Sequence, residues 1–351
     1  MTNNVLSERN YGADLFRIML MVMIVVHHCL VHGLGLLNLK KGLPVPEGMD
    51  SFSFFLLNGL CVVAVNSFFW LSGFFGIKRN YRKLIILYAE CMFYMLIMQT
   101  IFHCVRESAF SYKMIFLPIK DYWFMAAYFF VALVAPFINN CIRSFSSRER
   151  WSLIIVLILI NVFYGFIFDL SGVGNGYTAI QGVFMYVLGC VFSHEKKILS
   201  TYISKNGIWL GIYVLMSVSV SVIAWVFCTT SHYEYAWRAF AYNNPIICMG
   251  AVALCMFFVN MKKQNKVIKH IAMLSKYSLA IYLITDCFVI KKEIFSPILK
   301  FQTFPPPISC VVFYSICLCL MCICVDFVRK VLFDLVERFF CWISTLITNK
   351  G

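Results

Sequence analysis

The stretch DLFRIMLMVMIVVHHCLVHG, residues 14–33, decides the fold, because it is an apolar run of bilayer length that nevertheless carries an arginine and three histidines. About 20 apolar residues suffice to cross a membrane as an α-helix. On such a helix Arg17 and His28 lie within roughly 20° of one face and about 16 Å apart along the axis. His32 adjoins that face, whereas His27 points away by roughly 80°. This span therefore presents a cation near one membrane surface and imidazoles towards the other.

The composition assigns the whole chain to the polytopic membrane proteins. Of 351 residues, 61% are hydrophobic and 13% are charged, and the mean hydropathy is +0.81. These values exclude an ordinary soluble domain. The net charge of +14 comes from Lys and Arg in short loops between apolar runs, so it indicates contact with membrane lipids and not with nucleic acid.

The first apolar run is expected to stay in the mature protein, because it has neither a cationic leader cluster nor a small-residue cleavage site. The sixteen cysteines lie mostly inside apolar runs and are expected to have structural roles. The densest group, Cys317, Cys319, Cys322 and Cys324, points to at least two opposed sides of one helix. One helix cannot chelate a metal with all four, and no metal site is predicted.

The apolar runs predict an all-α protein with about ten transmembrane helices. A single transmembrane domain over residues 1–330 is followed by a cytoplasmic amphipathic tail over 331–351, which is expected to lie along the membrane interface. The predicted spans lie near residues 14–32, 52–76, 83–104, 122–142, 151–169, 176–193, 207–229, 241–260, 271–290 and 308–328.

The distribution of Lys and Arg predicts that both termini are cytoplasmic. With the N-terminus inside, the inner segments carry about nineteen of these residues and the outer loops about nine. Arg17 then lies near the cytoplasmic surface, and the first inner loop holds Phe75, Arg79 and Arg82. A second group is expected at the outer ends of the helices: His28, His32, Trp123, Asn243 and Asp286.

The outer group suggests acid–base chemistry. An imidazole beside a carboxylate is the minimum needed to remove a proton from a hydroxyl, so His28 is the candidate base and Asp286 its candidate partner. Each intramembrane histidine has the alternative of a packing residue bonded to a backbone carbonyl. An arginine and two histidines on or beside one face of a single span favour a functional role. Glu90 and Asp169, in or at the rim of spans, are weaker candidates.

The inner pair Arg79 and Arg82 has two interpretations. Guanidinium groups match phosphate oxygens in pairs, which suits a phosphorylated ligand. An ordinary cytoplasmic anchor explains the same spacing, and on spacing alone this second interpretation is favoured.

Several motifs carry a resemblance to a known family. Arg17 and His28 are separated by ten residues, His32 is followed by glycine, and Phe75 begins a Phe-x3-Arg-x2-Arg pattern. In the same order follow segments 122–124, 176–189, 242–258 and 277–286. Over about residues 9–290 the chain resembles the integral-membrane acyltransferase 3 family, especially bacterial members that O-acetylate surface polysaccharides.

The resemblance implies a ten-helix enzyme of the bacterial inner (plasma) membrane. It would take an acyl group, usually acetyl, from cytoplasmic acyl-CoA and place it on a hydroxyl of a cell-surface glycan or lipid-linked saccharide at the outer face. Acyl-CoA would be a co-substrate, with no bound cofactor.

The resemblance also assigns roles to residues. His28 would be catalytic, Arg17 would support donor handling, and Arg79 and Arg82, with Phe75, would bind the donor. His32, Trp123 and Asn243 fall on the acceptor side. One position departs from the pattern: Thr285 stands where many members have histidine, so the adjacent Asp286 is the candidate there by position.

Two other classes of function compete with acyl transfer. A transporter or flippase of lipid-linked saccharides would share the polytopic build and the intramembrane charges, but the sequence lacks an inverted-repeat pattern and paired Gly/Pro-broken helices. A non-catalytic scaffold or sensor would need no Arg/His signature. Membrane O-acyl transfer is the leading prediction.

Overall fold

The computed structural model describes residues 10–106, 110–169, 174–196, 198, 205–261, 265–300 and 304–348, and within these residues every regular element is a helix. Eight helical segments are long and apolar enough to cross a membrane. Two shorter apolar helices, α8 (Ala179–His194) and α12 (Pro245–Val259), accompany them. Together they occupy the sequence positions of the ten predicted spans, and the all-α prediction is confirmed.

The long elements follow the predicted spans closely. They are α1 (Tyr11–His28) with a π-helical extension (Cys29–Gly33), α2 (Phe52–Cys61) with α3 (Ala64–Phe75), α4 (Tyr81–Arg106), α6 (Trp123–Ser144), α7 (Ser147–Leu159) with a π-helical extension (Ile160–Ile167), α10 (Asn206–Thr229), α13 (Lys266–Met273) with α14 (Ser278–Thr285), and α16 (Ile308–Thr348). Short helices α5 (Tyr112–Phe116), α11 (Tyr233–Ala239) and α15 (Lys291–Phe295) lie in connections.

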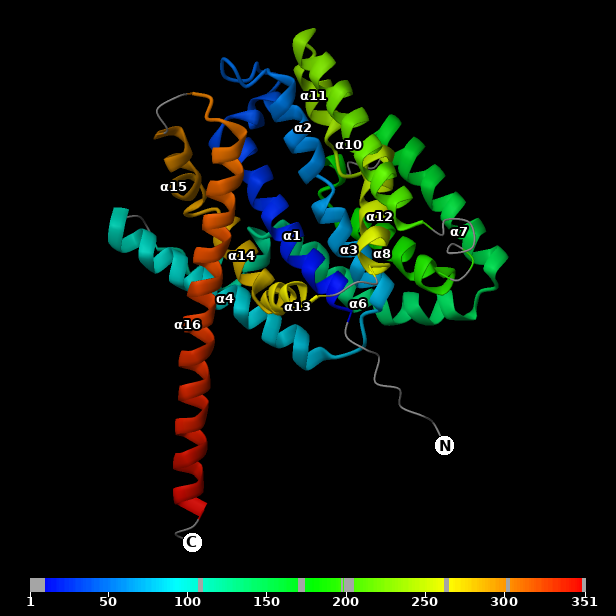
Figure 1. Ribbon diagram of the computed structural model, residues 1–351. Helices are drawn as coiled ribbons and strands as arrows, with labels where there is room; N and C mark the ends of the chain where they lie inside the picture. The colour runs from blue at the N-terminus through cyan, green and yellow to red at the C-terminus, as the bar shows by residue number, and fades with distance from the viewer. Residues whose placement is uncertain are drawn as a thin grey trace.

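Helix α1 lies in the middle of the bundle, where α2, α3, α12, α13, α14 and α16 pack around it (Figure 1). Its first turn is capped by Asn10, whose side-chain oxygen accepts a hydrogen bond from the Ala13 N–H at 3.0 Å. Phe16 then stacks on Phe258 of α12, with ring centres 4.5 Å apart. The span that carries Arg17 and His28 therefore lies at the centre of the fold, in contact with six other helices.

Helices α3 and α8 pack backbone to backbone because glycine occupies both sides of the contact. A Cβ atom on Gly73 would lie 1.9 Å from the Tyr186 carbonyl oxygen, and one on Gly189 would lie 2.1 Å from the Trp70 carbonyl oxygen. Small residues permit such close approach between membrane helices. This contact fixes the end of α3 and hence the basic loop that follows it.

Two elements differ from the predicted spans. The span predicted over 271–290 ends at Thr285, and the chain turns at Asp286 before the polar pair that opens α15. Helix α16 continues without a break to Thr348, because no Pro or Gly interrupts residues 308–348. The interfacial position of the tail stays a prediction.

The start of α1 and the far end of α16 lie at the same end of the bundle (Figure 1). This placement agrees with a chain whose two ends share one side of the membrane. We call this end inner and the opposite end outer; the assignment of the inner end to the cytoplasm stays a prediction.

Candidate active site

A cavity of about 240 Å³, the outer cavity, opens beside the last turns of α1. It gathers side chains from α1, α6, α14 and α15 that are far apart in the sequence. Its chemistry-bearing lining includes His28, His32, Trp123, Tyr282, Asp286 and Lys291. Four of these six residues were predicted for the outer face. Residues predicted to lie at the same depth in the membrane therefore do line one cavity.

His28 and Asp286 lie side by side in the outer cavity. The His28 Nε2 atom is 3.8 Å from Asp286 Oδ1, and the two side chains are 13% and 5% exposed. Asp286 also forms an ion pair with Lys291. Lys291 was not predicted as a site residue, because it is one of about nine Lys and Arg residues of the outer loops; the fold turns it towards the carboxylate. The cavity thus holds an imidazole, a carboxylate and an ammonium group in one chain of contacts.

The two adjacent histidines have different surroundings. His27 Nδ1 lies 2.7 Å from the Asn58 side-chain oxygen in a buried hydrogen bond, which agrees with its predicted direction away from the face of Arg17 and His28. His28 instead packs edge-on against His32 and Phe295, with ring centres 5.5 and 6.0 Å away. Its Nδ1 atom is buried and has no hydrogen-bond partner among the described residues. One nitrogen of His28 is therefore open to a ligand.

Aromatic rings form one wall of the outer cavity. Trp123 stacks on Tyr242 with ring centres 5.8 Å apart and planes at 19°, and Tyr177 meets Trp123 edge-on at 4.9 Å. Asp121 lines the same cavity, and burial raises its pKa. The three rings together form one aromatic face of the cavity. Tyr177 and Tyr242 were not predicted as site residues.

A buried amide network fixes this wall from behind. Asn66 Nδ2 and Gln181 Nε2 both donate to the Tyr242 carbonyl oxygen, at 2.8 and 2.9 Å. Asn243, predicted on the acceptor side, is buried behind Tyr242 and is not among the residues that line the cavity; its carbonyl oxygen accepts a hydrogen bond from Asn161. Tyr242 faces the ligand space instead, because the chain turns at 242–244 just before α12.

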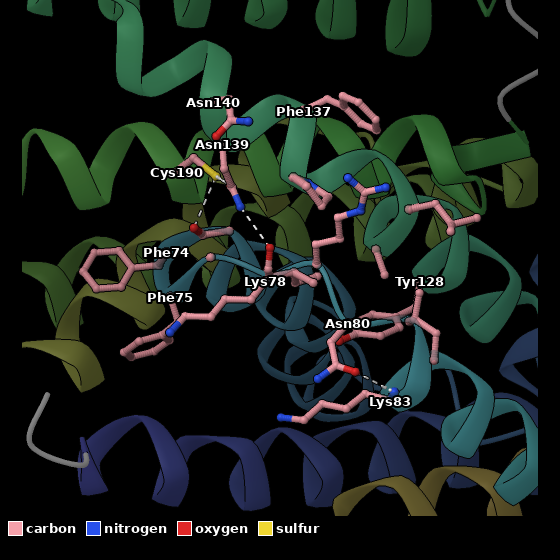
Figure 2. Close-up of a pocket in the computed structure, with 18 of the residues that line it drawn as sticks. Phe74, Phe75, Lys78, Asn80, Lys83, Tyr128, Phe137, Asn139, Asn140 and Cys190 are labelled. Carbon is pink, nitrogen blue, oxygen red and sulfur yellow. Dashed lines mark hydrogen bonds between the residues drawn. The ribbon is translucent and has the colours of Figure 1, made fainter. Parts of the chain in front are cut away.

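A second and much larger cavity, the inner cavity, opens at the other end of the bundle (Figure 2). Its volume is about 1200 Å³, and its walls come from the loop after α3 and from α4, α6 and α8. Lys78, Arg79, Lys83 and Arg143 line it, and no Asp or Glu is among its lining residues. Four cations without a carboxylate suit a ligand that carries several negative charges.

The predicted basic motif is only partly in this cavity. Phe75 and Arg79 line it, but Arg82 does not and is exposed. In the first turns of α4 the cavity is faced by Lys83 and Leu87, and Arg82 points to a different side of that helix. Arg143 approaches from the end of α6. Its place in the sequence, at a basic helix end, gave no signal that distinguished it from an ordinary membrane anchor.

Arg17 lies beside the inner cavity, although it is not among the residues that line it. Its Nη1 atom lies 2.5 Å from Asp14 Oδ1, and its guanidinium carbon lies 5.6 Å from the centre of the Phe75 ring, which lines the inner cavity. The two ends of the Arg17–His28 signature therefore serve two different cavities.

A closed cycle of three hydrogen bonds holds the basic loop in place. Asn139 Nδ2 donates to the Ile77 carbonyl oxygen at 3.0 Å, the Ile77 N–H donates to the Tyr186 hydroxyl at 3.0 Å, and that hydroxyl donates to Asn139 Oδ1 at 2.9 Å. Figure 2 shows Asn139 reaching from α6 towards the loop. The polar residue in the membrane helix is thus a clamp on the loop that presents Lys78 and Arg79.

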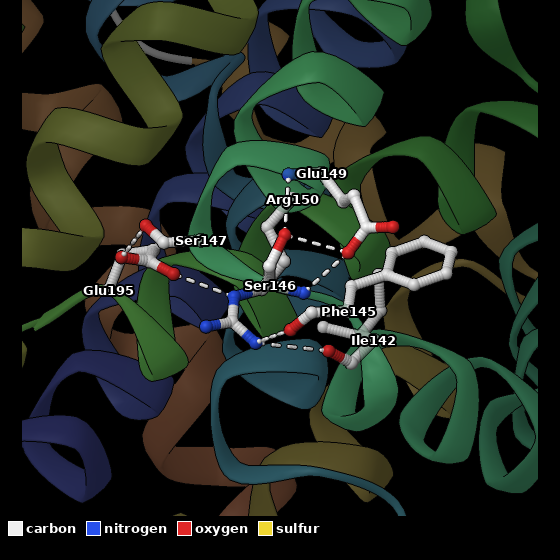
Figure 3. Close-up of polar contacts among 7 residues, drawn as sticks. All are labelled: Ile142, Phe145, Ser146, Ser147, Glu149, Arg150 and Glu195. Carbon is white, nitrogen blue, oxygen red and sulfur yellow. Dashed lines mark hydrogen bonds and ion pairs between the residues drawn. The ribbon is translucent and has the colours of Figure 1, made fainter.

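The corner between α6 and α7 is fixed by a second polar cluster (Figure 3). Arg150 Nε lies 2.6 Å from Glu195 Oε1, and Arg150 Nη1 donates to the Phe145 carbonyl oxygen at 2.5 Å. Ser146 and Glu149 form a capping box at the start of α7. The cluster thus fixes the backbone at the end of α6, the helix that carries Arg143.

A helical membrane bundle with a buried histidine–carboxylate pair at one end and a cationic cavity at the other has the build of a multi-pass membrane enzyme. The family model of an acyltransferase domain matches residues 10–324. The chain therefore belongs to the acyltransferase 3 family and is a membrane acyltransferase. No curated protein and no solved structure matches it.

Proposed function

We propose that the protein is an O-acyltransferase, most simply an O-acetyltransferase, of the bacterial inner membrane. It moves the acyl group of cytoplasmic acyl-CoA to a hydroxyl of a cell-surface or lipid-linked glycan at the outer face. The observation that carries the proposal is His28 in the outer cavity, with a carboxylate near one ring nitrogen and no partner on the other.

His28 is proposed as the general base, and its surroundings support one tautomer. A carboxylate near Nε2 favours the proton on that nitrogen, which leaves the Nδ1 lone pair free. Nδ1 can then accept the proton of an acceptor hydroxyl. The Asp286 carboxylate, which is paired with Lys291, can stabilise the imidazolium that results.

The inner cavity is proposed as the acyl-CoA site. The nucleotide head of CoA carries several phosphate charges, and the four cations of this cavity supply complementary ones. The guanidinium groups of Arg79 and Arg143 suit bidentate contact with phosphate. Basic residues at this end could also contact membrane lipids. Because no carboxylate among the lining residues offsets the four cations, the cavity favours a ligand with several negative charges.

The outer cavity is proposed as the acceptor site. Its volume of about 240 Å³ lies below the roughly 300–1,000 Å³ of pockets that enclose a drug-sized ligand, so it suits the end of a saccharide and not a long chain. Rings such as Trp123 offer broad faces to the C–H faces of a sugar, and the surrounding polar groups fix its orientation.

The two cavities come within one helical turn of each other along α6. Phe124 lines the outer cavity and Tyr128 lines the inner one, a separation of four residues or about 6 Å along the helix. The rings of these two residues stack, with centres 6.2 Å apart. The flexible arm of a CoA thioester held in the inner cavity needs to cross only this thin wall to bring its carbonyl near His28, which favours direct transfer.

The test uses purified protein in liposomes with labelled acetyl-CoA on the inner-cavity side and a glycan acceptor on the other. We expect acetylated glycan, and we expect His28→Ala to lower its rate by about 10³-fold, as for loss of a general base. His27→Gln is the matched control and should stay near the wild-type rate, because that residue packs against Asn58.

A second outcome would favour the competing class. Movement of lipid-linked saccharide across the bilayer without any acyl transfer would overturn the proposal and support a flippase. NMR of the surface glycan from cells with and without the gene then names the acceptor, since the O-acetyl signal should disappear with the gene.

A further inference from the structure

Eight buried side-chain polar atoms lack a hydrogen-bond partner among the described residues, and only two of them line either cavity. Those two are His28 Nδ1 and the Tyr282 hydroxyl, and both line the outer cavity. Buried hydroxyl groups are nearly always hydrogen-bonded, so each exception needs a reason. The convergence of two unsatisfied groups on one small cavity indicates that a ligand completes both.

The surroundings of Tyr282 hold its ring in a fixed direction. The residue is 5% exposed and lies on α14, one turn before Asp286. Its ring packs against Tyr122 and Phe124, with ring centres 5.8 and 5.4 Å away. A hydroxyl on a side chain held in this way is preorganised, so a ligand that accepts its hydrogen bond causes little rearrangement.

The neighbouring Tyr122 shows that a buried tyrosine hydroxyl in this region can form a hydrogen bond. Its ring touches that of Tyr282, yet its hydroxyl donates to the Leu283 carbonyl oxygen at 2.7 Å. One of two adjoining buried tyrosines is therefore tied to the backbone, whereas the other lines the cavity near the Asp286 carboxylate and makes no hydrogen bond of normal geometry with the described residues. Packing explains the first hydroxyl but not the second.

We propose that Tyr282 is a catalytic residue whose hydroxyl donates a hydrogen bond to the acyl carbonyl oxygen as that oxygen becomes negatively charged. This assignment rests on the proposed function. It requires that the thioester carbonyl enters the outer cavity between the two unsatisfied groups, with the acceptor hydroxyl on the His28 side and the carbonyl oxygen on the Tyr282 side.

In the proposed step, His28 Nδ1 takes the proton of the acceptor hydroxyl as its oxygen bonds to the carbonyl carbon, and the carbonyl π pair moves to oxygen, where Tyr282 donates to it. The C–O double bond then re-forms and the C–S bond breaks. The CoA thiolate leaves and takes the proton from His28, which returns histidine to its starting state and yields the ester and free CoA.

The experiment measures steady-state acetyl transfer by Tyr282→Phe in the liposome assay, with acetyl-CoA and the glycan acceptor varied separately. Loss of one oxyanion donor typically lowers kcat by about 10²–10³-fold, and we expect that loss with both KM values within about twofold. Tyr122→Phe is the matched control, with kcat near wild type and a lower melting temperature, because its hydroxyl supports only the backbone of α14.

Two results would overturn the assignment: a kcat for folded Tyr282→Phe within about threefold of wild type, or a loss confined to the KM values. If the Phe variant does not fold, 3-fluorotyrosine at position 282 keeps the ring and hydroxyl while making the hydroxyl a stronger donor. An unchanged kcat of the 3-fluorotyrosine protein would then count against the catalytic role of Tyr282. The His28→Ala variant separates the two proposals, since its inactivity beside an active Tyr282→Phe rejects only the role of Tyr282.

Discussion

The two cavities differ in size and in charge. The inner cavity, about 1200 Å³, is lined by four cations and by no carboxylate, whereas the outer cavity, about 240 Å³, mixes histidines, two aspartates and two lysines with aromatic rings. The first matches a large ligand with several negative charges, and the second a small ligand of little net charge. Under the proposed function, the difference teaches that donor and acceptor would be recognised by different interactions: ion pairs on one side, ring contacts and hydrogen bonds on the other.

The central helix α1 joins the two regions. Arg17 contacts Phe75 of the inner cavity, and His28 lies in the outer cavity. Under the proposed function, the helix would hold the residues for donor handling and for proton transfer about 16 Å apart. If the two regions are as distinct as their linings, substitutions in one should alter the kinetic constants of one substrate alone.

Substitution of the cations in the inner cavity should give the largest difference between the effects on the two KM values. Combining Arg79→Gln with Arg143→Gln removes two guanidinium groups that face the phosphates. A hydrogen bond to a charged group contributes about 1.5–3 kcal/mol, so the KM for acetyl-CoA should rise about 100-fold while the acceptor KM stays constant. Initial rates over a matrix of both substrate concentrations measure the two constants together.

Arg82→Gln is the control for this double substitution. It removes the same charge from a residue of α4 that does not line the cavity, although the sequence motif alone predicted a donor contact there. The donor KM should stay within about twofold of wild type, as expected for an exposed cation. A rise as large as that of the double variant would mean that the motif, and not the cavity, defines the donor site.

Substitution in the aromatic wall of the outer cavity should change the acceptor KM and not the donor KM. Trp123→Ala removes a ring that stacks on Tyr242, and aromatic contacts contribute about 0.5–1.5 kcal/mol, so the acceptor KM should rise about tenfold at most. The KM for acetyl-CoA should not change. Trp123→Phe retains a ring face and should recover most of the affinity. An equal rise in both KM values would show that Trp123 supports the fold and not the acceptor.

Sequence reasoning found the components of the outer site because their depth in the membrane could be read from the spans. His28 and Asp286 share a predicted depth, and the structure brings them to 3.8 Å. Lys291 was missed because the sequence does not distinguish an outer-loop lysine that faces water from one that pairs with a carboxylate. Tyr282 was missed because tertiary packing decides whether a buried hydroxyl has a hydrogen-bond partner, and the sequence pattern does not show that packing.

The inner site was predicted less completely, for a geometric reason. The motif beginning at Phe75 identified the right loop but not which arginine faces the cavity, because one residue along a helix changes direction by about 100°. Arg143 comes from a helix more than 60 residues away in the chain. The packing of α6 against α8 and the clamp on Ile77 bring it there, and both are tertiary contacts.

The clamp at Asn139 gives a smaller effect. Asn139→Ala leaves the Ile77 carbonyl oxygen and the Tyr186 hydroxyl with one partner fewer, and an unsatisfied buried group costs about 1–3 kcal/mol. We expect a lower melting temperature in detergent and a donor KM raised about fivefold, because the loop that holds Arg79 is released. Asn140→Ala, beside it in the same cavity, should keep the wild-type melting temperature. If both variants melt alike, the hydrogen-bonded cycle does not stabilise the loop.

The wall between the cavities provides the smallest and most specific test. Phe124→Ala removes one ring of the stacked pair Phe124–Tyr128, so water from the outer side gains access to the thioester. Hydrolysis of acetyl-CoA without acceptor should rise about threefold, since an intact wall protects a reactive group from side reactions. Tyr128→Phe keeps both rings and should leave hydrolysis at its basal rate. Release of free CoA measures the leak directly. Slower transfer by Phe124→Ala with no increase in hydrolysis would mean that the ring orients Tyr282, which it touches, and does not separate the two regions.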